Sequence, residues 1–218
     1  MAPVTDSRRR IDRRTRSARA QKRDARAALL DAAAKVFVER GYRDATIDDI
    51  AAAAGYSKGA VYWHFDGKEE LFFTLLEERV DRPMRESMQL FASAPPDQDM
   101  SLEGSRLFGH LAGTERETMI LDQEYWSLAL RDPKLRARYA KRQREMRDTF
   151  ARAITARAEQ LGTPEAAKNP EELATLFLSI ARGLSREKLM TPDVVPDHML
   201  GEAYATMYAG LVARSASD

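Results

Sequence analysis

The stretch GYSKGAVYWHFDGKEEL, residues 55–71, contains four aromatic residues, two lysines and a histidine in a short, apparently helical segment. Residues four apart in a helix share a face, so Val61 and Phe65 lie on one side and Lys58 and Tyr62 on another. We expect the first pair to enter a hydrophobic core. The second pair then faces outward, where large polar side chains are free to contact something other than this chain.

The segment before this stretch carries the signals of a second short helix. Thr46 is a typical N-cap, and Asp49 follows it three residues later, as in a capping box. Gly55 can take the positive φ angle that a tight turn needs. Ser57 caps the next helix, which ends near His64. Two short helices joined by a glycine turn predict a helix-turn-helix.

The outward face of the second helix suits a phosphate backbone and a major groove. Ser57 and the first backbone N–H groups can bind phosphate, and Lys58 can reach a phosphate or a guanine. Gly59 removes bulk where a DNA backbone must come close, and Tyr62 can donate to a phosphate or pack on a thymine methyl group. Alternatively, the aromatic residues cap a small hydrophobic core, and for Trp63 we keep both possibilities open.

These residues resemble the DNA-binding domain of the TetR/AcrR family of bacterial transcriptional regulators. The resemblance covers about 45 residues, from near Ala28 to Phe73. The positions that carry it are Thr46–Ala51, Gly55, Ser57–Phe65 and Lys68–Leu71. One departure is Gly67, where the family often places a Ser or Asn helix cap, and Asp66 is the candidate to replace that cap.

The resemblance implies a homodimer that places one recognition helix in each major groove of a palindromic operator in double-stranded DNA. Transferred by position, it implies DNA contacts from Thr46, Ser57, Lys58, Gly59, Tyr62, Trp63, His64 and Lys68. Lys68, at the start of the following helix, is expected to hold a phosphate.

The remaining sequence predicts further helices and no strand. Apolar residues recur at helical spacing, Gly41 predicts the end of the first helix, and a long helix is expected over 68–91. We therefore predict an all-α fold of about nine helices. The expected parts are a flexible basic arm over 1–24, a helix-turn-helix DNA-binding domain over 25–72, and a helical ligand-binding and dimerisation domain over 73–218.

Charge is distributed unevenly along the chain. Residues 1–26 carry ten Lys or Arg and three Asp. The rest of the chain carries 25 of the 35 basic residues and 31 of the 34 acidic residues. A basic segment joined to an acidic body indicates a polyanionic partner. The alternative is a solubilising tail. The resemblance favours the first interpretation, because it places the arm near DNA, where it can enter a minor groove or add phosphate contacts.

Composition excludes several other classes. The chain has no cysteine, so it has neither a disulfide framework nor thiolate metal ligands. No apolar run approaches the roughly 18 residues that span a membrane, and the N-terminus lacks a secretory apolar segment, so we expect a soluble cytoplasmic protein. We find no nucleophile–base pair, metal-ligand set or glycine-rich phosphate loop, and therefore predict neither an enzyme nor a cofactor.

The helical body is expected to bind an unidentified small-molecule effector. In the segment LDQEYWSLAL, residues 121–130, Glu124 interrupts an apolar stripe and is followed by Tyr125 and Trp126. An acid beside aromatic rings suits a cationic, lipophilic ligand, whereas the alternative is an ion pair with Arg138 or Arg142. Four further residues either line the cavity or pack in the core, namely Tyr139, Met146, Phe150 and Phe177.

The last two apolar segments, 171–188 and 198–213, are expected to form the dimer face, with completion of the monomer core as the alternative. Together these features predict a repressor that a small molecule releases from DNA. The competing hypothesis keeps DNA binding but gives the body a protein partner instead of a small ligand. A cavity in the body would favour the first, and an exposed apolar patch outside the dimer face would favour the second.

Overall fold

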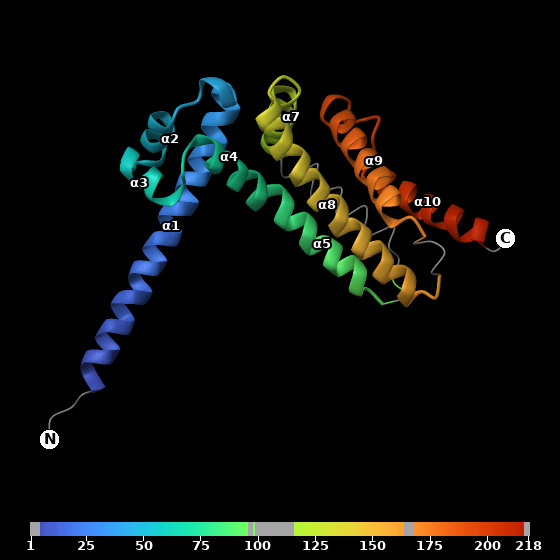
Figure 1. Cartoon of the computed structure of the whole chain (residues 1–218), viewed down its shortest axis with the longest axis horizontal. Helices are drawn as coiled ribbons and strands as arrows, with labels where there is room; N and C mark the ends of the chain where they lie inside the picture. Colours follow the sequence, from blue (N-terminus) through green and yellow to red (C-terminus); the bar gives the residue numbers. More distant parts are fainter. Residues whose placement is uncertain (1–4, 96–97, 99–115, 164–167, 216–218) are drawn as a thin grey trace. The chain divides into compact units, whose positions relative to one another are not determined.

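The structure, a computed structural model, describes residues 5–95, 98, 116–163 and 168–215 (Figure 1). These residues form helices and no strand, which confirms the all-α prediction. The chain divides into two compact units, residues 1–76 and residues 77–218. The division falls four residues after the boundary predicted at 72, because the helix that begins at Lys68 continues to Leu76.

The first unit contains α1 (Thr5–Asp44), α2 (Ile47–Ala54), α3 (Lys58–His64) and α4 (Lys68–Leu76). Gly41 interrupts the helical geometry of α1 with φ 77°, at the predicted stop. The described part of the basic segment is helical rather than a separate arm, because α1 already begins at Thr5. Its many arginine residues and its alanines are good helix formers.

Aromatic rings hold the first unit together. Phe37 of α1 and Phe72 of α4 are fully buried and meet edge to face, with ring centroids 5.3 Å apart. Tyr42 lies 4.9 Å from Phe72 in a similar arrangement. Ile50 of α2 and Val61 of α3 are also fully buried. The four helices therefore share one small core, which sets the orientation of α3.

The single long helix predicted over 68–91 is wrong, because the structure divides it into three parts. After α4 comes η1 (Glu77–Asp81), a π-helical segment, and then α5 (Arg82–Ser93). Pro83 occupies the first turn of α5. Its ring carries no N–H and clashes with the carbonyl four residues earlier, so α-helical bonding cannot continue unchanged through this point. Pro83 is the sequence signal that predicts this break.

The second unit contains η1, α5, α7 (Arg116–Ala129), α8 (Pro133–Gln160), α9 (Pro170–Met190) and α10 (Met199–Ser215). Helix α8 lies between α5 and α9 and also contacts α7 (Figure 1). Asp132 caps α8 by accepting hydrogen bonds from the backbone N–H groups of Lys134 and Leu135 at 2.8 and 3.2 Å. Asp132 is therefore the N-cap of α8, and Pro133 is its first residue.

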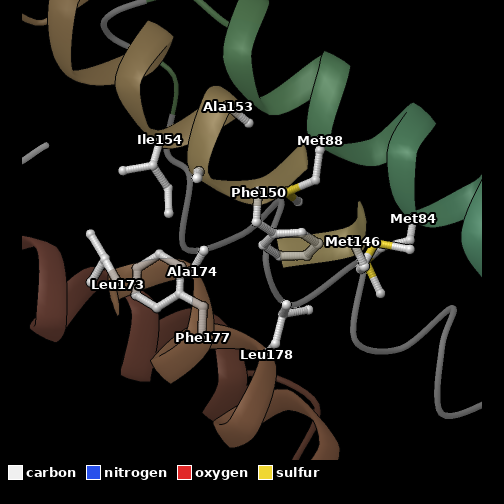
Figure 2. Close-up of a cluster of buried hydrophobic side chains, with 11 residues drawn as sticks. Met84, Met88, Met146, Phe150, Ala153, Ile154, Leu173, Ala174, Phe177 and Leu178 are labelled. Carbon is white, nitrogen blue, oxygen red and sulfur yellow. The ribbon is translucent and has the colours of Figure 1, made fainter. Parts of the chain in front are cut away.

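The core of the second unit lies where α5, α8 and α9 meet (Figure 2). Its labelled members come from all three helices and comprise Met84, Met88, Met146, Phe150, Ala153, Ile154, Leu173, Ala174, Phe177 and Leu178. Helix α10 joins this core through Tyr204, whose ring stacks on Phe177 at 4.4 Å and whose hydroxyl donates to the Phe177 carbonyl at 3.1 Å.

Candidate DNA-binding surface and ligand cavity

The turn between α2 and α3 is held by capping side chains. Thr46 Oγ1 accepts from the backbone N–H of Asp49 at 3.1 Å, and Asp49 Oδ2 accepts from the backbone N–H of Thr46 at 3.1 Å, which confirms the predicted capping box. Gly55 ends α2 in the left-handed conformation, with φ 73°. Ser57 caps α3 by accepting from the N–H of Ala60 at 3.2 Å. The helix-turn-helix geometry is therefore built from short-range bonds.

Helix α3 has the two faces that its spacing predicts. Val61 and Phe65 are 0% and 2% exposed, whereas Tyr62 and Trp63 are 51% and 64% exposed. Two large aromatic side chains therefore stand in solvent on a seven-residue helix. Neither ring is part of the buried core, so the exposure of Trp63 argues against the core-capping alternative that the sequence leaves open.

Charged residues surround this exposed face. The ammonium of Lys22, on α1, lies 4.1 Å from the centre of the Trp63 ring. The ammonium of Lys58 lies 2.8 Å from a carboxylate oxygen of Asp48 on α2, and both of these side chains are exposed. An exposed ion pair contributes little to stability, so an incoming phosphate can take the place of Asp48 at small cost. Lys58 is thus available for a polyanion.

His64 lies at the edge of the same surface, and its ring is 4.7 Å from that of Trp63. Burial, together with the positive charges of Lys22 and Arg26, lowers the pKa of His64 below its usual value. The imidazole is therefore neutral near pH 7.

Lys68 differs from its predicted role as a phosphate contact. Its Nζ atom donates to the backbone carbonyls of Tyr42, Arg43 and Ala45 at 2.8, 3.0 and 2.9 Å. An ammonium group has three N–H donors, so all three are used. The carbonyls lie at the C-terminal end of α1 and just beyond it, where unpaired acceptors and the helix dipole favour a cation. Lys68 therefore caps α1 in this structure, and these bonds compete with its predicted phosphate contact, which stays a prediction.

We expect the substitution Lys68→Gln to destabilise the end of α1 by about 1.5–3 kcal/mol, because charge-assisted hydrogen bonds are lost. Hydrogen exchange of the backbone amides of α1 in the full chain measures this change. The matched control is Lys58→Gln, which removes only an exposed ion pair and should leave amide protection unchanged. Unchanged protection in Lys68→Gln, combined with weaker DNA binding, would restore the phosphate role.

The second unit contains a cavity of about 720 Å³. Its wall is formed by residues of η1, α5, α7, α8 and α9. Of the seven residues predicted to bind a ligand, Glu124 and Met146 line it. A cavity of this size accommodates an ordinary small-molecule ligand.

The other five predicted residues lie outside the cavity wall, because they are used for packing. Phe150 and Phe177 belong to the core between α8 and α9. Tyr125 is fully buried and stacks with Tyr139 at a centroid separation of 6.3 Å. Trp126 is partly exposed, with the guanidinium of Arg186 5.8 Å from its ring centre. These five residues therefore pack in the core or at the surface rather than along this cavity, and their ligand contacts stay predictions.

A buried charge cluster forms part of the cavity wall. Arg142 of α8 donates from Nε and Nη2 to the two carboxylate oxygens of Asp81 at 2.7 and 2.8 Å, and from Nη1 to Asp122 at 2.5 Å. Tyr139 also donates to Asp122, at 3.0 Å. The side chains of Arg142 and Asp81 are only 11% and 7% exposed. One guanidinium therefore links η1, α7 and α8.

The protonation states within this cluster follow from burial and charge. Burial lowers the pKa of Arg142, but Asp122 and Asp81 outweigh that effect, so the net shift is upward and the guanidinium stays charged. Burial, followed by the charge of Asp122, raises the pKa of Tyr139, so its hydroxyl stays protonated and able to donate. Burial raises the pKa of Asp81, and Arg142 opposes that shift.

The sequence names Arg142 as a possible partner for Glu124, but the structure pairs it with Asp81 and Asp122. Neither aspartate has a sequence signal of its own, because each looks like an ordinary helix-surface acid. Arg182 and Arg186 also line the cavity, and neither is among the residues predicted to bind a ligand. Their four-residue spacing beside the apolar stripe of α9 is a signal that could have identified them.

None of the described helices combines the length and apolar character needed to cross a bilayer. Within the same residues, no group of three or more histidine, aspartate or glutamate side chains is arranged to hold a metal ion.

Two family sequence models match this chain. The model of bacterial regulatory proteins of the tetR family matches residues 29–75, and the model of the C-terminal part of BetI-type transcriptional repressors matches residues 106–213. The first match covers the helix-turn-helix, and the second covers most of the body.

Individual proteins resemble the chain over different parts. TtgW, an uncharacterized HTH-type transcriptional regulator of Pseudomonas putida, is 47% identical over 64 residues, which are 29% of this chain and 48% of TtgW. FasR, an HTH-type transcriptional activator of Mycolicibacterium smegmatis, is 50% identical over 56 residues, 26% of each protein. These matches span less than half the length of either curated relative.

SmeT of Stenotrophomonas maltophilia resembles nearly the whole chain. Its structure in complex with triclosan superposes with a TM-score of 0.65 and 26% sequence identity, over 86% of this chain and 91% of SmeT. SmeT is described as the repressor of the multidrug efflux pump SmeDEF. The likeness therefore extends through both compact units.

Proposed function

Because this chain belongs to the TetR family of bacterial transcriptional regulators, we propose that it is a cytoplasmic, homodimeric repressor released from a palindromic DNA operator by a small molecule. The observation that carries the DNA-binding part is the division of α3. Val61 and Phe65 are buried, while Tyr62 and Trp63 are exposed. A helix anchored on one side and aromatic on the other suits insertion into a major groove.

The proposed DNA surface includes the predicted residues other than Lys68. Tyr62 contacts the major groove. Lys58 exchanges its ion pair with Asp48 for a phosphate, and Gly59 allows the DNA backbone to come close. Thr46, Ser57, Trp63 and His64 complete the surface from the turn and the two helix ends. The basic residues over 1–26 supply further phosphate contacts.

The proposed dimer face lies on α9 and α10. Leu176 of α9 is more than half exposed, although it is a large apolar residue. Gly183 lies inside α9, where glycine costs about 1 kcal/mol relative to alanine. Beyond the adjacent part of its own helix, a Cβ at Gly183 would meet no described atom within 4 Å, so packing within the described chain does not explain the glycine. A helix of a second copy, approaching closely, would account for both features.

The effector is proposed to act through the cavity of the second unit. Asp81 lines that cavity and lies five residues after Leu76, the last residue of the DNA-binding unit. A ligand that changes the packing around Asp81 and Arg142 therefore acts on the segment that joins the two units. The protein exchanges between a state that binds DNA and one that does not. A ligand that binds the second state more tightly lowers DNA affinity in proportion to that preference. The volume of the cavity favours a small ligand over a protein partner.

We expect Tyr62→Ala to weaken specific DNA binding about ten- to a hundredfold, since it removes a contact worth about 1–3 kcal/mol. Fluorescence anisotropy with labelled intergenic DNA beside the chain's own gene measures this loss. Tyr62 is exposed, so the variant should unfold at the same temperature as the parent.

The control for this experiment is Tyr56→Ala, which changes a similarly exposed tyrosine that the proposal does not assign to DNA. Equal affinity for the fragment and for random DNA, in a correctly folded dimer, would contradict an operator in that fragment. A genome-wide binding map then decides whether an operator lies elsewhere. Preserved specific binding in Tyr62→Ala would remove α3 from the proposed interface.

A further inference from the structure

The charges around the cavity are arranged by helix. Two carboxylates come from η1 and α7, namely Asp81 and Asp122, and both are bonded to Arg142. Glu124, the third acid in the wall, also makes an interaction of its own. The acidic side of the cavity is therefore already engaged within the protein.

The basic side differs, because its partners are neutral. Arg182 and Arg186 are four residues apart on α9, so both project from one face of that helix. Arg182 donates to the amide oxygen of Gln143, and Arg186 lies over the Trp126 ring. Among the described residues, neither guanidinium lies within ion-pair distance of a carboxylate. Two like charges at this spacing repel each other, and an anion between them relieves that repulsion.

Much of the remaining wall of the cavity is apolar. Met84, Met146, Leu178 and Ala181 line it and are buried, whereas Arg182 and Arg186 are exposed to solvent. The arginines therefore stand at the solvent side of a buried apolar floor. Methionine side chains are flexible, so this floor can adapt to a chain of variable shape.

We propose that the cavity binds an amphipathic anion, with its carboxylate or phosphate headgroup on Arg182 and Arg186 and its apolar chain on the methionine-rich floor. Arginine suits either headgroup, because its planar fork of donors matches both. This inference rests on the proposed effector site and specifies its ligand class. It reverses the charge expected from Glu124, because the acids of the wall already have partners and these arginines have only neutral ones.

Three probes with the same tail test the proposal, namely decanoate, decyl phosphate and decyltrimethylammonium, each below its micelle concentration. The readout is the fluorescence of Trp126 in the Trp63→Phe chain, where it is the single tryptophan. We expect at least one anion to bind at least tenfold more tightly than the cation. Comparison of decanoate with decyl phosphate identifies the preferred headgroup.

The variants Arg182→Gln and Arg186→Gln should each reduce anion affinity about tenfold, because each removes a charge-assisted contact. Calorimetry checks both variants, since Arg186 also contacts the reporter ring. Affinity for the cation should stay equal or rise. Arg152→Gln is the matched control, because Arg152 lies on α8, is exposed and is absent from the cavity wall. Circular dichroism verifies that each variant remains folded.

Tighter binding of the cation, or anion binding that both arginine variants leave unchanged, would overturn the proposal. These binding measurements use no DNA, so they are independent of the proposed repressor function. If an anion binds through the arginines but does not release DNA, the proposed anionic ligand class is supported and the proposed release of DNA by a ligand is contradicted. If only a cation releases DNA, the proposed release by a ligand is supported and the proposed anionic ligand class is contradicted.

Discussion

Replacing Arg142 with alanine is expected to lower the free energy of unfolding of the second unit by about 3–5 kcal/mol, because the substitution leaves two buried or partly buried carboxylates without their cation. Asp81 and Asp122 are both bonded to this guanidinium. Desolvated charges without a partner cost far more than an exposed ion pair contributes. Urea unfolding followed by circular dichroism and by hydrogen exchange within residues 116–163 measures the loss.

The neighbouring residue provides a matched control. Lys141 is one position earlier on α8 and faces Glu145 across 3.8 Å, but both of these side chains are exposed. We expect Lys141→Ala to change stability little. The double variant Asp81→Asn with Asp122→Asn should tolerate the loss of Arg142 better than the parent chain does. Equal stability of Arg142→Ala and Lys141→Ala would show that the cluster does not stabilise the fold.

Phe150→Ala is expected to cost about 3–5 kcal/mol of stability, since it leaves a large cavity in a close-packed core. Phe150 is 2% exposed, and Figure 2 shows it among side chains of α5, α8 and α9. Its surroundings are built from three helices, so they cannot collapse around the lost ring without moving a helix. Denaturant unfolding of the full chain provides the measurement.

Two comparisons sharpen this test of Phe150. Leu90→Ala removes an apolar side chain of α5 that is 71% exposed, and it should leave unfolding nearly unchanged. Phe150→Leu keeps most of the volume and should lie between the parent and Phe150→Ala. If Phe150 instead contacted a ligand, Phe150→Ala would change stability little and would reduce ligand affinity strongly. That result would contradict its position in the core.

The short-range features of the first unit were predictable from sequence. The capping box of Thr46, the left-handed Gly55 and the N-cap Ser57 depend on residues two to four positions apart. The buried and exposed faces of α3 follow from the helical repeat in the same way. The break at η1 was also within reach, because a proline such as Pro83 inside a helical pattern disrupts the helical bonding before it.

Features that depend on distant residues came only from the tertiary structure. Arg142 finds Asp81 61 positions away and Asp122 20 positions away, and Lys68 reaches carbonyls 23 to 26 positions earlier. Helical periodicity indicates that a residue such as Phe150 is buried, but it does not show whether the side chain lies in the core or lines the cavity. The position of the side chain depends on which helices pack against it. The sequence alone thus determined most of the helices, their short-range caps and the outward aromatic face of α3, because those interactions are local. Helix packing decided the long-range Lys68 cap, the charge partners and the cavity.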